Sequence, residues 1–91
     1  MKKSSEQFFT LSEDVLFQEV GGELVLLDMA SENYFGLDEV GARIWSLLGE
    51  GKSLGAVLEI LQQEYDVEPD VLERDVSDLL DQLLKSGLVR V

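Results

Sequence analysis

The first part of the chain alternates apolar and polar residues in short runs typical of β-strands. Two such runs, 15–20 (VLFQEV) and 23–28 (ELVLLD), are separated by a Gly21-Gly22 pair. Because glycine accepts the positive φ angles of a tight primed turn, we expect these runs to form an antiparallel hairpin. A third short run, 33–37 (NYFGL), predicts either a three-stranded meander or a hairpin with a loosely held third strand.

After residue 37 the apolar residues recur every three to four positions, which predicts helices. The first helix follows Asp38, an N-cap residue, and its apolar stripe includes Trp45, which we expect to lie in the core. Ser53 can cap a second helix that runs to about Tyr65. Pro69 begins a third at a first-turn position, where its missing N–H has no helical partner to lose.

This order of elements predicts an α+β fold with a three-stranded antiparallel sheet followed by three helices that cover one sheet face. A chain of 91 residues, 45% of them apolar, has room for one small core. We expect residues 13–91 to form a single domain and residues 1–12 to form a flexible N-terminal arm. The last residues, 88–91 (LVRV), could add a short strand.

Composition limits the chemistry of the chain. Nineteen Asp and Glu residues against seven Lys and Arg give a formal net charge of −12, so phosphate backbones and anionic membranes would be repelled. The sequence has neither cysteine nor histidine, so disulfides and the usual zinc ligands are absent. The N-terminus lacks the apolar run of a secretion signal. We therefore expect a cytoplasmic protein that has no metal or cofactor and binds neither nucleic acid nor membrane.

The third strand, residues 33–37, has no evident partner on its outer side. An unpaired strand edge exposes N–H and C=O groups, which proteins normally shield with charge, proline or a covering segment. Here the apolar residues Tyr34 and Phe35 stand on that edge. The edge is therefore either covered by local structure or open to an added strand from another chain.

The third helix carries acidic residues beside its apolar stripe. At about 100° per residue, Val71, Asp75, Asp78 and Gln82 share one flank, and Glu73, Ser77, Leu80 and Leu84 share the other. The pattern leaves open which flank faces the sheet edge. Residues 59–81 contain nine carboxylates and one basic residue. These carboxylates form either a solvated face or a surface that attracts a basic partner segment.

The sequence gives no indication of catalysis. Paired carboxylates can act as acid and base, but no nucleophile motif, phosphate-binding loop or calcium loop accompanies them. An acyl carrier would need an Asp-Ser-Leu step at the start of a helix, whereas Lys52 precedes Ser53-Leu54 here. We therefore expect a protein that is not an enzyme.

Several short motifs occur along residues 24–89 in a fixed order and spacing: Leu27-Asp28, Tyr34-Phe35-Gly36-Leu37, Gly41, Ile44-Trp45, EYDV before Pro69, and LLKSGLV. In these motifs the chain resembles the family of the pyrroloquinoline quinone biosynthesis D protein, the peptide-recognition elements of ribosomally made, modified peptides. In length and free-standing form, the chain is also similar to the small leader-binding half of the split B protein of lasso peptide clusters, whose other half is a cysteine protease.

The resemblance implies a winged helix-turn-helix-like fold and a function in peptide capture. Family members take a leader peptide as an extra antiparallel strand on the third strand and hold it against the third helix. This chain would then bind the leader of a precursor peptide without catalysis and deliver it to a partner leader peptidase or other modifying enzyme. The peptide-binding residues expected from it are Glu32, Asn33, Tyr34, Phe35, Val71, Asp75, Asp78 and Leu79.

A second hypothesis belongs to a different class of protein. An acidic winged-helix domain that acts in regulation or as an adaptor, through protein contacts, would contain the same small sheet and three helices. A DNA-reading helix must approach phosphates, however, and the last two helices are the most acidic part of this chain. Peptide capture is therefore the preferred interpretation.

Overall fold

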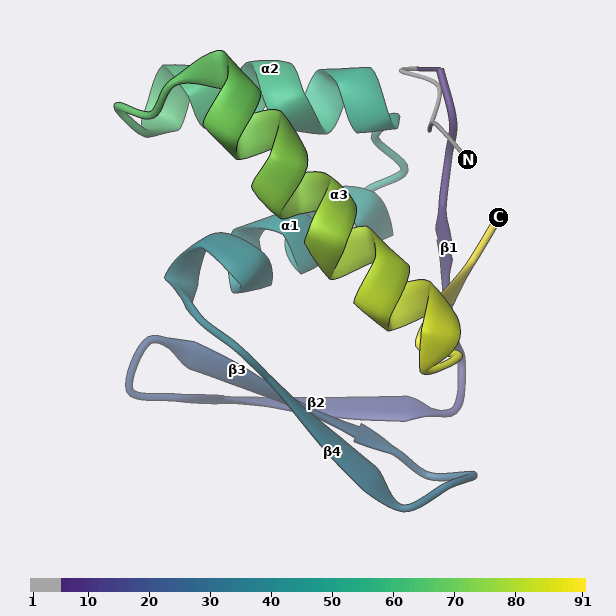
Figure 1. Ribbon diagram of the computed structural model, residues 1–91. Coiled ribbons are helices and arrows are strands. Elements are labelled where there is room, and N and C mark those ends of the chain that lie inside the picture. The colour runs from purple at the N-terminus through teal and green to yellow at the C-terminus, as the bar shows by residue number, and fades with distance from the viewer. Residues whose placement is uncertain (1–5) are drawn as a thin grey trace.

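A computed structural model describes residues 6–91 (Figure 1). The three predicted strands and three predicted helices are present in the predicted order, the short strand considered for residues 88–91 is present, and a further short strand lies near the start of the described residues. The elements are β1 (Thr10–Leu11), β2 (Val15–Val20), β3 (Glu23–Asp28), β4 (Asn33–Leu37), α1 (Glu39–Gly49), α2 (Leu54–Glu64), α3 (Pro69–Lys85) and β5 (Val89–Arg90).

The main sheet is an antiparallel meander in the order β2-β3-β4. Gly21 and Gly22 have φ angles of 60° and 86°, as a primed two-residue turn requires, so β2 and β3 pair over six residues each. All five residues of β4 pair with β3, from Leu24 opposite Leu37 to Asp28 opposite Asn33. The third strand is therefore a full member of the sheet, which decides between the two predicted arrangements.

Side-chain caps fix where the first two helices begin. The Asp38 carboxylate accepts a hydrogen bond from the N–H of Gly41 at 2.8 Å, and the Ser53 hydroxyl accepts one from the N–H of Ala56 at 3.3 Å. Both caps were predicted. Helix α3 begins with Pro69 and has no side-chain cap. Asp38 is the single residue between β4 and α1, so the first turn of α1 must lie at the end of β4.

The helices pack on one face of the sheet and leave the other face bare (Figure 1). Side chains from β3, β4 and all three helices fill the core, and Trp45 is buried there as predicted. Truncating a buried leucine in such a core commonly reduces the free energy of unfolding by about 2–5 kcal/mol. Tests of binding are therefore best made at exposed positions.

A second, two-stranded sheet joins the two ends of the chain. β1 pairs antiparallel with β5, so that Thr10 lies opposite Arg90 and Leu11 opposite Val89. Phe9 is buried in the core. The expected flexible arm of residues 1–12 falls partly on residues 1–5, which lie outside the described residues. Within the rest of that arm, Phe9 packs into the core and Thr10 and Leu11 form β1.

One ion pair links α1 to α2. The guanidinium of Arg43 donates two hydrogen bonds to the carboxylate of Glu64, from Nε to Oε1 at 2.9 Å and from Nη2 to Oε2 at 2.8 Å. These bonds lower the pKa of Glu64 and raise that of Arg43. The pair is exposed, so its effect on stability is small.

No helix within residues 6–91 combines the length and apolar character needed to cross a membrane.

Candidate functional site

The hydrogen-bond pattern of the sheet shows which groups of β4 face its open edge. The N–H of Met29 donates to the C=O of Asp14 at 2.9 Å, so odd-numbered residues of β3 bond toward β2 and even-numbered ones toward β4. Phe35, opposite Leu26, therefore belongs to the ladder. The N–H and C=O groups of Tyr34 and Gly36 point the other way. Within residues 6–91 no strand pairs with this edge.

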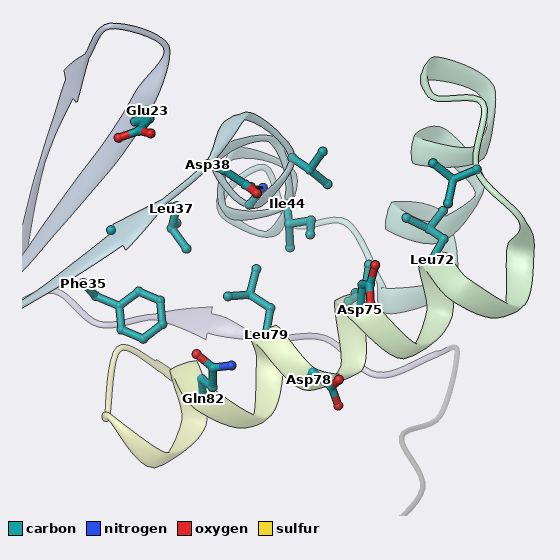
Figure 2. Close-up of a pocket in the computed structure, with 15 residues that line it drawn as sticks. Glu23, Phe35, Leu37, Asp38, Ile44, Leu72, Asp75, Asp78, Leu79 and Gln82 are labelled. Atoms are coloured by element: carbon teal, nitrogen blue, oxygen red, sulfur yellow. Dashed lines mark hydrogen bonds between the residues drawn. The ribbon is translucent and has the colours of Figure 1, made fainter.

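A groove of about 720 Å³ runs between β4, the start of α1 and α3. Figure 2 shows Phe35 and Leu37 from β4 and Leu79 from α3 pointing into a common space. Ile44 closes the groove on the side of α1. The apolar lining residues are Phe35, Leu37, Val40, Ile44, Val67, Leu72, Val76 and Leu79. Such a floor can hold an apolar side chain away from water.

The rim of this groove is acidic. Asp75 and Asp78 contribute carboxylates from α3, while Asp38 and Glu23 contribute theirs from the sheet side. One oxygen of Asp38 is already used to cap α1. The lining includes no Lys or Arg. The groove can therefore attract a cationic side chain as well as an apolar one.

The structure brings together half of the residues predicted for peptide binding. Phe35, Asp75, Asp78 and Leu79 all line the groove. The flank of α3 that carries Asp75 and Asp78 is thus the one that faces β4, which the sequence had left open.

The other four predicted residues do not line the groove. Glu32 lies in the β3–β4 turn with a φ angle of 60°, and Asn33 begins β4. The side chain of Tyr34 is 74% exposed and lies on the opposite face of the sheet, although its backbone faces the open edge. Val71, on α3, is 37% exposed and lies outside the lining.

Sequence reasoning missed the contribution of α1. Val40, Gly41 and Ile44 all line the groove, and Ile44 is buried in the core as well. The place of Ile44 in the apolar stripe of the first helix is consistent with the core, but its part in the groove was not foreseen. The signal was present in the single-residue connection at Asp38, because so short a connection forces the first turn of α1 against the end of β4. The other lining residues missed were Gly36, Leu37, Asp38, Val67, Leu72, Val76, Gln82 and Glu23.

A second groove, of about 610 Å³, lies on the other side of the domain between β2 and α1. Its residues are Leu11, Phe17, Glu19, Leu24, Ala42, Trp45, Ser46 and Gly49. Phe17 is 65% exposed although it shares the inner sheet face with the core residue Leu26, its partner across the sheet. The lining contains one carboxylate, that of Glu19.

The described residues offer peptide-binding groups rather than a metal centre. Within residues 6–91 no group of three or more carboxylates, histidines or cysteines is placed to hold a metal ion. The groove between β4 and α3 combines unpaired backbone groups, an apolar floor and an acidic rim. These are the features that receive an extended chain by strand addition.

Comparison with protein families gives a match over residues 23–89 to the model of coenzyme PQQ synthesis protein D (PqqD). The chain belongs to the PqqD family. A search of curated proteins gave no match to the chain.

Two solved structures resemble this PqqD-family chain over nearly its whole length. One is TbiB1 in complex with the TbiA(beta) leader peptide, with 40% sequence identity, a TM-score of 0.82, and coverage of 89% of this chain and 94% of that one. The other is lasso peptide synthetase B1 complexed with the leader peptide, with 30% identity, a TM-score of 0.84, and coverage of 93% and 100%. The winged-helix-like α+β fold expected from the sequence is thus confirmed.

Proposed function

We propose that this PqqD-family chain is a non-catalytic module that binds the leader of a ribosomally made precursor peptide. The leader adds as an antiparallel strand to the free edge of β4 and lies in the groove against α3. The observation that carries this proposal is the coincidence of the two features, because unpaired groups of Tyr34 and Gly36 border an apolar groove. Two similar structures contain a leader peptide, which supports the same conclusion.

The groove predicts the kind of leader that it accepts. Side chains of an added strand alternate between the two sheet faces, so every second one would point toward Phe35, Leu37 and Leu79. At least one of these should be a large apolar or aromatic residue. A Lys or Arg of the leader should lie near Asp75 and Asp78, on the acidic rim.

Capture of the leader serves an enzyme that acts on the same precursor. We propose that the partner is a leader peptidase or another modifying enzyme in the cytoplasm, within lasso peptide biosynthesis. Because a bound precursor is kept close to the enzyme, its effective concentration rises without any new chemistry in the binding domain. The proposed site residues include Glu32, Asn33 and Val71 at the margins of the groove, beside those that line it.

The test is a binding titration with a fluorescently labelled leader peptide from the precursor encoded in the same gene cluster. Tyr34→Pro removes an edge N–H that takes no part in the sheet ladder. Loss of one hydrogen bond and the intrusion of the proline ring should weaken binding by about tenfold or more. The matched control is Phe17→Pro, because the Phe17 N–H faces the free edge of β2 in the same way.

The outcomes separate the possible functions. Weaker leader binding by Tyr34→Pro, with unchanged binding by Phe17→Pro and unchanged helical circular dichroism, supports strand addition at β4. Equal affinity in both variants and the wild type rejects that mode. Binding of duplex DNA without any binding of leader would instead support a regulatory winged-helix domain.

A further inference from the structure

The sheet has an apolar surface that the core does not use. Side chains alternate along each strand, so the residues between the core positions lie on the face that no helix covers, here called the outer face (Figure 1). One row crosses all three strands, because Leu16 lies opposite Leu27 and Leu27 opposite Tyr34. Leu16 is 58% exposed and Tyr34 is 74% exposed. The row carries no charge, although the chain as a whole has a net charge of −12.

Gly36 provides a second observation on the outer face. Its φ angle lies outside the left-handed region, and a Cβ atom added to it would meet nothing within 4 Å. Neither the backbone conformation nor the space around residue 36 therefore requires glycine. Glycine within a strand reduces stability and commonly marks a place where another molecule comes close to the backbone. Gly36 lies opposite Val25, in the row of cross-strand neighbours next to the row that contains Tyr34.

We propose that the outer face is the docking surface for the enzyme that processes the bound leader, with Leu16, Val25, Leu27, Tyr34 and Gly36 as its centre and Gln18, Val20 and Glu23 beside them. This inference rests on the proposed function. The enzyme should present an apolar patch with a basic margin, because the centre of the outer face is apolar, Glu23 stands beside it, and the chain has a net charge of −12.

A second copy of the chain fits the outer face poorly. Three strands of five or six residues cover on the order of 300 Å², whereas a stable interface buries about 800 Å² on each partner. Two copies would also bring together net charges of −12 each. An enzyme that holds the far end of the same precursor needs less contact area, because the shared peptide raises the local concentration of the enzyme at the domain.

The position of Tyr34 connects the outer face with leader binding. Tyr34 stands at the open edge of β4, so a strand added there places one of its own side chains next in the row Leu16–Leu27–Tyr34. The row becomes one residue longer when the leader is bound. The enzyme should therefore bind the occupied domain more tightly than the empty one, and by reciprocity the enzyme should tighten leader binding.

The experiment compares two neighbouring residues of β2 that point to opposite faces. Leu16→Lys places a charge on the outer face, and Phe17→Lys places the same charge in the groove between β2 and α1, at 58% and 65% exposure. The probe is the purified precursor with the leader-processing enzyme from the same gene cluster. We measure the concentration of domain that gives half-maximal processing, and separately the affinity for labelled leader.

Leu16→Lys should raise the half-maximal concentration by about tenfold and leave leader affinity unchanged, whereas Phe17→Lys should change neither. If Phe17→Lys alone impairs processing, the enzyme docks in the β2–α1 groove and the inference is wrong. It is also wrong if both variants behave as wild type, or if sedimentation shows that the wild-type domain forms a dimer that Leu16→Lys dissociates. Failure of the wild type to bind leader would overturn the proposed function itself, which the affinity measurement shows separately.

Discussion

Both outer strands of the sheet have a free backbone edge in the described part of the chain, and each borders a groove. The two sides nevertheless differ. On the β4 side the inner-face residue Leu37 is buried and Phe35 is partly buried against the core, while on the β2 side Phe17 stays 65% exposed. The β4 groove has four carboxylates in its lining and the β2 groove has one. Under the proposed function, the apolar floor and the acidic rim distinguish the β4 edge as the peptide site, because an open edge beside a helix is present on both sides.

The largest change in leader affinity should come from a charge placed on the floor of the β4 groove. Leu79→Glu removes apolar contact and adds an ionised group where a leader side chain would be buried, so leader affinity should fall about 100-fold. Val71→Glu makes the same charge change on α3 at the margin of the proposed site, where the side chain is 37% exposed, and should have a much smaller effect. Fluorescence anisotropy with labelled leader measures both. A loss as large in Val71→Glu would mean that binding does not depend on the floor of the groove.

Reversing a charge on the acidic rim tests whether electrostatics distinguishes the two sides. Asp75→Lys should weaken binding of a leader that contains Lys or Arg by about five- to tenfold at low salt, and the loss should shrink as salt increases. Glu73→Lys, on the opposite flank of α3, is the matched control. Titrations of both variants with labelled leader at two ionic strengths measure how the loss of affinity depends on salt. A loss that does not depend on salt would argue against attraction by the rim.

Alanine substitutions at Gly41 and Gly49 test how tightly the two ends of α1 are packed. A Cβ atom at Gly41 would lie 3.2 Å from two atoms of Leu37 and 3.3 Å from the capping oxygen of Asp38, whereas one at Gly49 would meet the end of the Leu11 side chain at 3.1 Å. The first contact involves the Cβ of Leu37, which cannot move without the backbone of β4. Gly41→Ala should therefore reduce the free energy of unfolding by about 1 kcal/mol, net of the gain in helix propensity.

Gly49→Ala should be close to neutral, because the flexible end of Leu11 can move aside. Urea denaturation of both variants measures the difference. Equal destabilisation would show that the corner between β4 and α1 is no more rigid than the opposite end of the helix.

The smallest effect is expected at the exposed ion pair between α1 and α2, which lines neither groove. Arg43 lowers the pKa of Glu64, so the pair stabilises the folded state fully above the ordinary pKa of Glu, about 4.3. This contribution is lost as the pH falls through the lowered pKa of the folded state. Glu64→Gln should thus cause a small decrease in Tm at pH 7 that disappears in acid. A decrease that persists below both pKa values would indicate lost packing instead.

Local chemistry made much of the fold predictable. The Gly21-Gly22 turn, the caps at Asp38 and Ser53 and the proline at residue 69 each act within a few residues, so the strands and helices between them could be placed from the sequence. The β1–β5 pair could not, because it joins the two ends of the chain through a two-residue ladder. Nothing in the local pattern of either segment indicates its partner.

The groove was predictable only in part, for a related reason. Phe35 and the acidic flank of α3 follow from strand alternation and helical periodicity. Tyr34 was expected beside them, but alternation within β4 turns its side chain to the other face and leaves its backbone at the edge. Val40 and Gly41 line the groove because only Asp38 separates β4 from α1, so the first turn of the helix lies at the end of the strand. The strand and helix patterns taken separately do not reveal this contact.

The pairing of β1 with β5 also affects where the chain of this domain can begin and end. The first and last strands of residues 6–91 lie side by side (Figure 1), with Thr10 at the start of β1 opposite Arg90 at the end of β5. Joining these two strands and opening a new pair of ends elsewhere would therefore need only a short connection from Arg90 to Thr10, so the domain should tolerate circular permutation.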